Sequence, residues 1–161
     1  MRGLLLVSYL SCLCLSLLRL KRREALRVKQ MEEFLLLLRR IRREVACYAR
    51  PLSEIFRDAD LPALSSAGFF DRTSDPAPHP GRAFRRAAPA LLLPPDAFEL
   101  LASFFSSAGA SLKSEELAAC DHAISGLDEL LAREKRDGAV RLKLHSTLIL
   151  SGGLLFLLLV F

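Results

Sequence analysis

The residues that could bind a metal ion or act as nucleophiles are few and scattered. They are the three histidines and the two cysteines of the middle of the chain: His79, His122, His145, Cys47 and Cys120. Cys120 and His122 are two residues apart, and on a helix this spacing points their side chains about 200° away from each other. Such an arrangement argues against a shared zinc ion. We interpret Cys120 as a core residue and His122 as a solvated one.

No other set of residues points to catalysis or to a cofactor. A phosphate-binding loop needs a glycine-rich turn between a strand and a helix. The glycines of Ser151-Gly152-Gly153 instead lie inside an apolar stretch. The carboxylates have no catalytic partner at a suggestive spacing and are typical of solvated helix faces. We therefore expect a protein with no active site and no cofactor.

The chain ends in eighteen residues, 144–161, that contain no Lys, Arg, Asp or Glu: LHSTLILSGGLLFLLLVF. A helix of about 20 apolar residues crosses the hydrocarbon of a bilayer, so we predict a C-terminal transmembrane helix over this range. Gly152 and Gly153 are candidates for helix packing in the membrane, because small residues let helices approach closely. Glycine is also generally frequent in membrane helices, so both interpretations stay open.

A second apolar stretch, residues 3–18, lies at the other end of the chain. A cluster of basic residues follows it: Arg19, Lys21, Arg22 and Arg23. A cleaved signal peptide carries its charge before the apolar part, so we predict an uncleaved transmembrane anchor over residues 1–20. The basic cluster is expected to face lipid headgroups. The alternative is a lipoprotein signal with acylation at Cys12.

The charge distribution predicts the orientation in the membrane. A second group of basic residues precedes the final apolar stretch: Arg133, Lys135, Arg136, Arg141 and Lys143. Basic residues beside membrane spans favour the cytoplasmic side. We therefore expect two spans in the cell membrane and a cytoplasmic middle segment. The net charge of +5 is assigned to contact with membrane lipids and not with nucleic acid, because it is concentrated beside the apolar ends.

The first part of the middle segment has the pattern of a basic amphipathic helix. Apolar residues recur there at alternating steps of three and four: Met31, Phe34, Leu38, Ile41, Val45, Tyr48 and Leu52. This spacing indicates a narrow, coiled-coil-like seam. The arginines between them fall on other faces and should be solvated: Arg39, Arg40, Arg42 and Arg43. Arg50-Pro51 ends the helix, and a short second helix completes the predicted region 21–64.

The rest of the middle segment divides into a loop and further helices. Residues 65–80 are rich in proline, which favours an extended loop. Residues 81–143 contain new helical patterns, and the last of them is expected to continue through Gly138 into the final apolar stretch. Nothing indicates a strand. The predicted fold class is all-α, an antiparallel helical bundle or hairpin forming a soluble domain, with a transmembrane helix at each end.

Three blocks of sequence together carry a family resemblance. The first is the anchor and basic helix, which end in a Glu-x-x-x-Tyr-x-x-Pro-Leu corner formed by Glu44, Tyr48, Pro51 and Leu52. The second is the helix from Phe98 to Gly109, and the third is the Lys143-Leu144 pair before the final apolar span. In this order they resemble the stage III sporulation protein AB family of endospore-forming bacteria.

Parts of the chain depart from the family pattern. Residues 65–89 show no clear match to it. Glycine would be expected at Phe105, and an Asp–Gln pair would be expected at Leu112 and Glu116. These departures concern a shared polar contact and leave the architecture unchanged.

The resemblance implies a part in the channel built between mother cell and forespore during engulfment. The soluble domain of the family is similar to the cytoplasmic domain of the platform protein F of type II secretion systems, which meets an assembly ATPase. By that analogy the chain is a non-enzymatic scaffold on the mother-cell side. Its expected partners are sporulation channel proteins and the cytoplasmic assembly ATPase.

Two hypotheses from other classes remain open at the level of the sequence. One is a membrane-bound thiol or metal enzyme that uses Cys120, Cys47 and His122. The other is a lipoprotein that is anchored at Cys12 and has its body outside the cell membrane.

Overall fold

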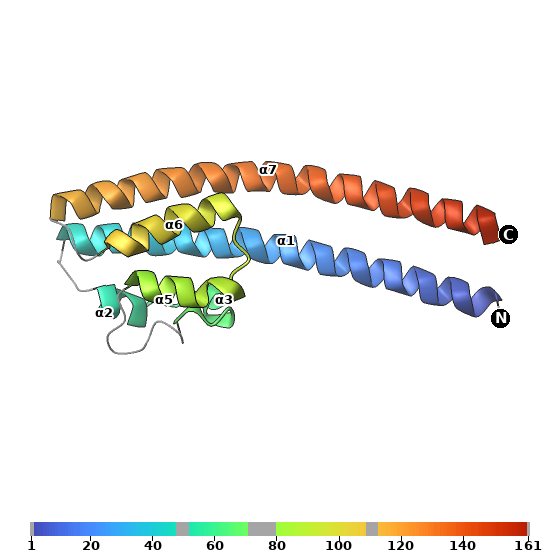
Figure 1. The fold of residues 1–161 in the computed structure, drawn as a ribbon, viewed down its shortest axis with the longest axis horizontal. Coiled ribbons are helices and arrows are strands. Elements are labelled where there is room, and N and C mark those ends of the chain that lie inside the picture. The colour runs from blue at the N-terminus through green and yellow to red at the C-terminus, as the bar shows by residue number, and fades with distance from the viewer. Residues whose placement is uncertain (1, 48–51, 71–79, 109–112, 161) are drawn as a thin grey trace. The chain divides into compact units, whose positions relative to one another are not determined.

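The structure, a computed structural model, describes residues 2–47, 52–70, 80–108 and 113–160. Within helices, the side chains of residues 2–10 and 154–160 and of several single residues are not described. The described ranges contain helices and no strand (Figure 1), in the order α1 (Arg2–Cys47), α2 (Leu52–Arg57), α3 (Pro62–Ser66), α5 (Pro80–Ala87), the 3-10 turn η1 (Ala88–Ala90), α6 (Pro95–Ser107) and α7 (Lys113–Val160). The all-α prediction is confirmed.

The chain divides into two compact units. The central unit is Leu26–Ala132, and the end unit consists of Met1–Ala25 together with Arg133–Phe161. The long helices α1 and α7 each contribute residues to both units. The predicted continuation of the last helix through Gly138 is confirmed, because α7 is uninterrupted there.

Prolines set helix boundaries in the central unit. Helix α3 begins at Pro62 and α6 begins at Pro95. The first turn of a helix tolerates proline because its N–H groups have no partner within the helix. After α3 the chain turns at Gly68, whose φ of 72° lies in the left-handed region that glycine adopts without steric cost.

Four phenylalanines form the centre of the central unit. Phe34 of α1, Phe69 after α3, Phe84 of α5 and Phe105 of α6 are each at most 1 % exposed. The rings of Phe34 and Phe69 meet edge to face with centroids 5.2 Å apart, and those of Phe84 and Phe105 stack at 5.0 Å. Aromatic pairs prefer such edge-to-face and offset arrangements. The core thus joins three helices and the segment after α3.

The apolar seam predicted on α1 faces this core. Its members within the described residues are buried: Met31, Phe34, Leu38, Ile41 and Val45. Tyr48 and the side chain of Leu52 lie outside the described residues.

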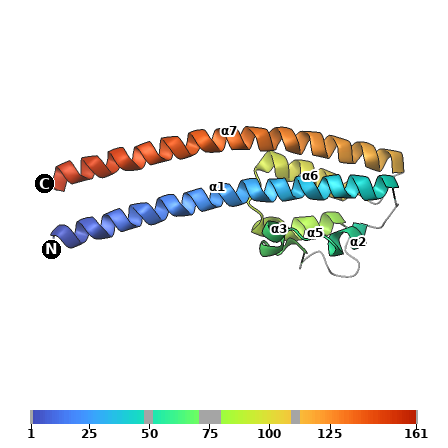
Figure 2. The same ribbon diagram turned by 180° about the vertical axis from the view of Figure 1, so that it is seen from behind.

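Two glycines allow close packing against α6. A Cβ added to Gly81 of α5 would come within 2.9 Å of the Cα of Ser106, and one added to Gly126 of α7 would come within 3.0 Å of Cδ2 of Leu100. Within the central unit, Figures 1 and 2 show α7 on one side of α1 and the group of α2, α3 and α5 on the other. Helix α6 therefore packs against both α5 and α7.

The predicted loop at residues 65–80 differs from the structure at both described ends. Helix α3 runs to Ser66, Phe69 is buried in the core, and α5 begins at Pro80. The prediction of a loop was based on the prolines. Phe69 is buried instead because removing its apolar ring from water is favourable in free energy. Residues 71–79 lie outside the described residues.

The end unit is an antiparallel pair formed by the start of α1 and the end of α7 (Figures 1 and 2). A Cβ added to Gly153 would lie 3.7 Å from Cδ1 of Leu13, and one added to Gly138 would lie 3.7 Å from Oε2 of Glu24. The two helices therefore approach each other closely at Gly138 and again at Gly153.

Among the described residues, no helix offers a stretch that is both long and apolar enough to cross a membrane. The transmembrane helices predicted at residues 1–20 and 144–161 find no support in that part of the chain. Of these two segments, the side chains of residues 1–10 and 154–161 are outside the described part.

Candidate functional site

The residues considered for thiol chemistry do not form a reactive group. Cys120 is fully buried in α7, whereas His122 and Cys47 are exposed. Burial raises the pKa of the Cys120 thiol to about 11, and the neighbouring carboxylates of Glu116 and Asp121 add to the rise. A nucleophilic cysteine must be a thiolate, so Cys120 is in the unreactive form at neutral pH.

The other candidates for metal binding and for acylation form no site within the described residues. Cys12 is exposed within the continuous helix α1. His79 and the side chain of His145 lie outside the described residues. Within the described ranges, no group of three or more His, Cys, Asp or Glu is placed to hold a metal ion.

Two buried polar side chains of α1 hold neighbouring segments of the central unit. The carboxylate of Glu33, 5 % exposed, accepts hydrogen bonds from the N–H groups of Ala63 and Leu64, both at 2.9 Å. Oε1 of Gln30 accepts one from the N–H of Leu92 at 2.8 Å. The two N–H groups bound by Glu33 belong to the first turn of α3 and have no partner within that helix, so the carboxylate caps it. Glu33 thus fixes the segment that leads into α3.

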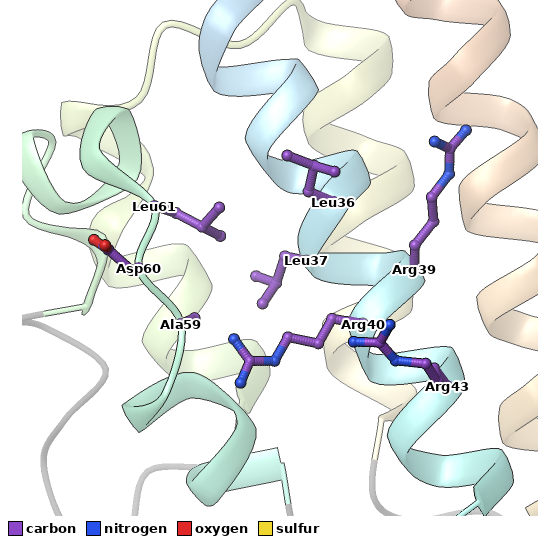
Figure 3. A pocket seen from close by; sticks show the side chains of 8 residues that line it. All are labelled: Leu36, Leu37, Arg39, Arg40, Arg43, Ala59, Asp60 and Leu61. Carbon is purple, nitrogen blue, oxygen red and sulfur yellow. The ribbon is translucent and has the colours of Figure 1, made fainter.

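That segment forms one wall of a pocket of about 300 Å³ (Figure 3). The wall consists of Ala59, Asp60 and Leu61. The opposite wall is a stretch of α1: Leu36, Leu37, Arg39, Arg40 and Arg43. We call this the arginine–leucine pocket. Figure 3 shows Arg40 extending from α1 towards the opposite wall, whereas the guanidinium of Arg39 points away from it, and the α1 wall carries positive charge.

Leu36 is the exposed apolar side chain of this pocket. It is 56 % exposed, although Leu35 and Leu37 beside it are buried. It therefore adds an exposed apolar surface to the rim of the pocket. Its exposure distinguishes Leu36 from the buried members of the apolar seam.

The three arginines of the pocket are differently engaged. A terminal nitrogen of Arg40 donates to the backbone oxygen of Asp58 at 2.8 Å. Arg39 lies 3.7 Å from Asp128 in an exposed ion pair, which is weak because water screens it. Arg43 makes no hydrogen bond or ion pair with any residue that the structure describes. The pocket therefore retains guanidinium donors for a ligand.

Comparison with the models of known families shows to which family the chain belongs. The family model of stage III sporulation protein AB matches residues 3–161. The chain belongs to the stage III sporulation protein AB family. Membership implies a role in stage III of sporulation, and it confirms the resemblance seen in the three sequence blocks. No curated protein and no solved structure matches the chain.

The structure explains one departure of this member from the stage III sporulation protein AB pattern. Phe105, where glycine was expected, stacks on Phe84 and also lies 6.5 Å from Phe34, centroid to centroid. The larger side chain fills the core where three elements meet. Glu116 is half-buried on α7, and Leu112 lies outside the described residues.

The candidate residues of the end unit differ in what surrounds them. The basic cluster predicted to face lipid is exposed on α1: Arg19, Lys21, Arg22 and Arg23. Gly153 faces Leu13 across the helix pair, whereas a Cβ added to Gly152 would have nothing within 4 Å. Gly153 therefore lies at the contact between the two helices, and Gly152 points away from it.

The arginine–leucine pocket was missed at the sequence level, where its arginines were assigned to a solvated face. Arg42, which was assigned to the same solvated face, lies outside the pocket. It donates a hydrogen bond from Nε to the carboxylate of Asp121, which raises the pKa of Arg42. A signal was present in the sequence. Leu36 precedes Arg40 and Arg43 by four and seven residues, which places all three on one face of the helix outside the apolar seam.

Proposed function

We propose that this member of the stage III sporulation protein AB family is a non-enzymatic scaffold of the channel between mother cell and forespore. Its two ends anchor it in the mother-cell membrane. Its central unit lies in the cytoplasm and docks or couples the assembly ATPase. The choice of partner rests on the family resemblance, and the anchoring rests on the arrangement of the end unit.

The observation that carries the proposal is the antiparallel pairing of the end unit. In α1 the apolar stretch comes before the basic cluster, and in α7 the basic residues come before the apolar stretch. Antiparallel pairing therefore places apolar beside apolar, as Leu13 and Gly153 show, and charged beside charged, as around Glu24 and Gly138. A hairpin with one apolar end and one charged end is what insertion from a single membrane face requires.

The exposure of side chains in the end unit also supports an apolar environment. Four of its leucines are exposed: Leu15, Leu18, Leu144 and Leu148 are 58 %, 54 %, 58 % and 68 % exposed. Lipid is a favourable surrounding for such a surface, and water is not.

The hydroxyl groups of the end unit bond within their own helices. Ser16 donates to the carbonyl oxygen of Cys12 at 2.8 Å, and Thr147 donates to that of Lys143 at 2.8 Å. A hydroxyl that is satisfied in this way does not need water and is tolerated within a membrane. These contacts therefore fit the same environment as the exposed leucines.

Purification of the tagged full chain from sporulating cells in mild detergent tests the proposal. The channel proteins and the assembly ATPase are expected to co-purify, and an in-frame deletion is expected to abolish heat-resistant spores. Wild-type spore numbers after deletion would contradict the proposal. Purification of the chain without any channel protein would contradict the scaffold role.

Alanine substitutions separate the scaffold from the competing hypotheses. The scaffold predicts that the triple variant Cys47→Ala, Cys120→Ala, His122→Ala sporulates at the wild-type level. Loss of spores at an unchanged protein level would favour the thiol or metal enzyme. Loss of spores in Cys12→Ala, together with lipid labelling that depends on Cys12, would favour the lipoprotein.

A further inference from the structure

The arginine–leucine pocket combines two features that a purely solvated helix face lacks. Leu36 is one of only two large apolar side chains exposed in the described part of the central unit, and it is more exposed than the other, Leu26, which is 42 % exposed. It lies one and two helical turns from Arg40 and Arg43, at the edge of a hollow that a second segment closes (Figure 3). The pocket therefore presents an apolar side chain and positively charged groups to the same ligand.

The size and charge of the pocket restrict its occupant. A volume of about 300 Å³ is at the lower end of the range of about 300–1,000 Å³ for small-molecule pockets, so it suits one or two side chains. Arginine pairs favourably with carboxylates because its planar donors match the two carboxylate oxygens. The occupant should therefore present an apolar side chain with acidic residues beside it.

We infer that the arginine–leucine pocket binds an acidic, leucine-bearing helical segment of a partner protein. The apolar side chain of the segment packs on Leu36, and its carboxylates bind Arg40 and Arg43. The spacing of four and seven residues along α1 matches a partner helix that carries acidic residues three or four positions from its leucine. The inference rests on the proposed function in one respect, that the segment belongs to a docked channel protein.

A protein segment explains the pocket better than an anionic lipid does. Lipid headgroups are attracted by flexible basic residues on an open surface. Here Arg40 is held by the backbone oxygen of Asp58. A guanidinium held in place favours a ligand of fixed geometry, which a folded partner supplies and a fluid headgroup layer does not.

Photo-crosslinking in sporulating cells tests the inference. A photoreactive phenylalanine analogue replaces Leu36 in the full chain, and the adduct is sequenced by mass spectrometry. We expect a protein segment with a leucine or phenylalanine flanked by Asp or Glu. The same analogue at Leu26 serves as the control and should not capture that segment.

Charge reversal provides the second arm. Arg43→Glu should lower the yield of the Leu36 adduct about tenfold, since one arginine at an interface centre commonly contributes this much. Arg85→Glu, an exposed arginine on α5 outside the pocket, should leave the yield within about twofold. A matching Glu→Arg change in the captured segment should restore binding to Arg43→Glu.

Three results would overturn the inference. They are an adduct of lipid alone, a captured segment without acidic residues, and equal losses for Arg43→Glu and Arg85→Glu. Failure here is distinct from failure of the proposed function. If the channel proteins co-purify equally with wild type and Arg43→Glu, the docking face is wrong and the scaffold stands. If no channel protein co-purifies and an acidic segment is still captured, the scaffold fails and the pocket stands.

Discussion

The central unit and the end unit bury opposite kinds of side chain. In the central unit most apolar side chains of α1 are buried, among them Phe34, Leu37 and Leu38, whereas Arg39, Arg42 and Arg43 of the same helix are exposed. In the end unit none of the described apolar side chains is buried, whereas Glu134 is only 9 % exposed and pairs with Arg141 at 2.6 Å. A core that excludes water stabilises the first unit on its own. The second unit lacks such a core among its described residues, so its helix pair depends on the surroundings.

The largest effect expected from this contrast is the loss of a core ring. Phe34→Ala should lower the free energy of unfolding by about 3–5 kcal/mol, because the site is fully enclosed and leaves a cavity. Leu148→Ala in the end unit should change it by less than about 0.5 kcal/mol in detergent. Denaturant unfolding of the full chain, followed by circular dichroism, measures both. Equal losses would remove the distinction between the units.

The buried carboxylates of the two units should differ next. Glu33→Ala leaves two buried N–H groups of α3 without an acceptor and should cost about 3 kcal/mol. Glu134→Ala should cost less, because Arg141 is 42 % exposed and can be solvated by water. Hydrogen exchange at Ala63 and Leu64 reads the first effect directly. Unchanged protection of these amides in Glu33→Ala would show that the cap does not hold α3.

The thiol of Cys120 makes the stability of the central unit dependent on pH. Its pKa is about 11 when folded and 9.0 in the reference state, so between these values the unfolded chain has lost a proton that the folded chain retains. The contribution of this thiol to the free energy of unfolding is therefore fully present below about pH 9. It is lost as the pH rises towards 11, which lowers the free energy of unfolding by about 2 kcal/mol.

The matched comparison is Cys120→Ala, whose stability should fall less over the same interval. Thermal unfolding at pH 8 and pH 10.5 provides the measurement. Identical pH dependence in the two proteins would mean that the thiol is not protected by burial.

The smallest effect concerns the two glycines of the end unit. Gly153→Leu should disturb the helix pair by about 1–2 kcal/mol, because its new side chain meets Leu13. Gly152→Leu should leave the pair intact, because that position is open. Spin labels at Leu15→Cys and Ser151→Cys in a chain without other cysteines report the separation. A distance distribution that broadens equally for both variants would contradict the assignment of Gly153 to the contact.

The sequence was most informative where periodicity and burial coincide. The seam on α1 could be predicted because its spacing of three and four is continuous and its described members all face one core. Pro62 and Pro95 are the first residues of α3 and α6, which the sequence pattern did not predict as helix starts. Phe69 was misplaced because neighbouring prolines gave the stronger local signal, and its burial depends on rings that are distant in the sequence.

The pocket could not be predicted for a related reason. The exposure of Leu36 and the positions of Arg40 and Arg43 follow from the helix pattern. The opposite wall is held by Glu33 through bonds to a segment about thirty residues further along the chain. No local pattern reveals a long-range contact of this kind.

Thiol labelling in intact cells is the most direct test of a membrane-anchored scaffold. The natural Cys47, exposed at the end of α1, is kept as the only cysteine, and a second protein carries only Leu148→Cys. We predict that a membrane-impermeant maleimide labels Cys47 only after the cells are permeabilised. It should label Leu148→Cys only after detergent removes the bilayer. Labelling of Cys47 in intact cells, or free reaction of Leu148→Cys in intact or permeabilised cells, would contradict the account.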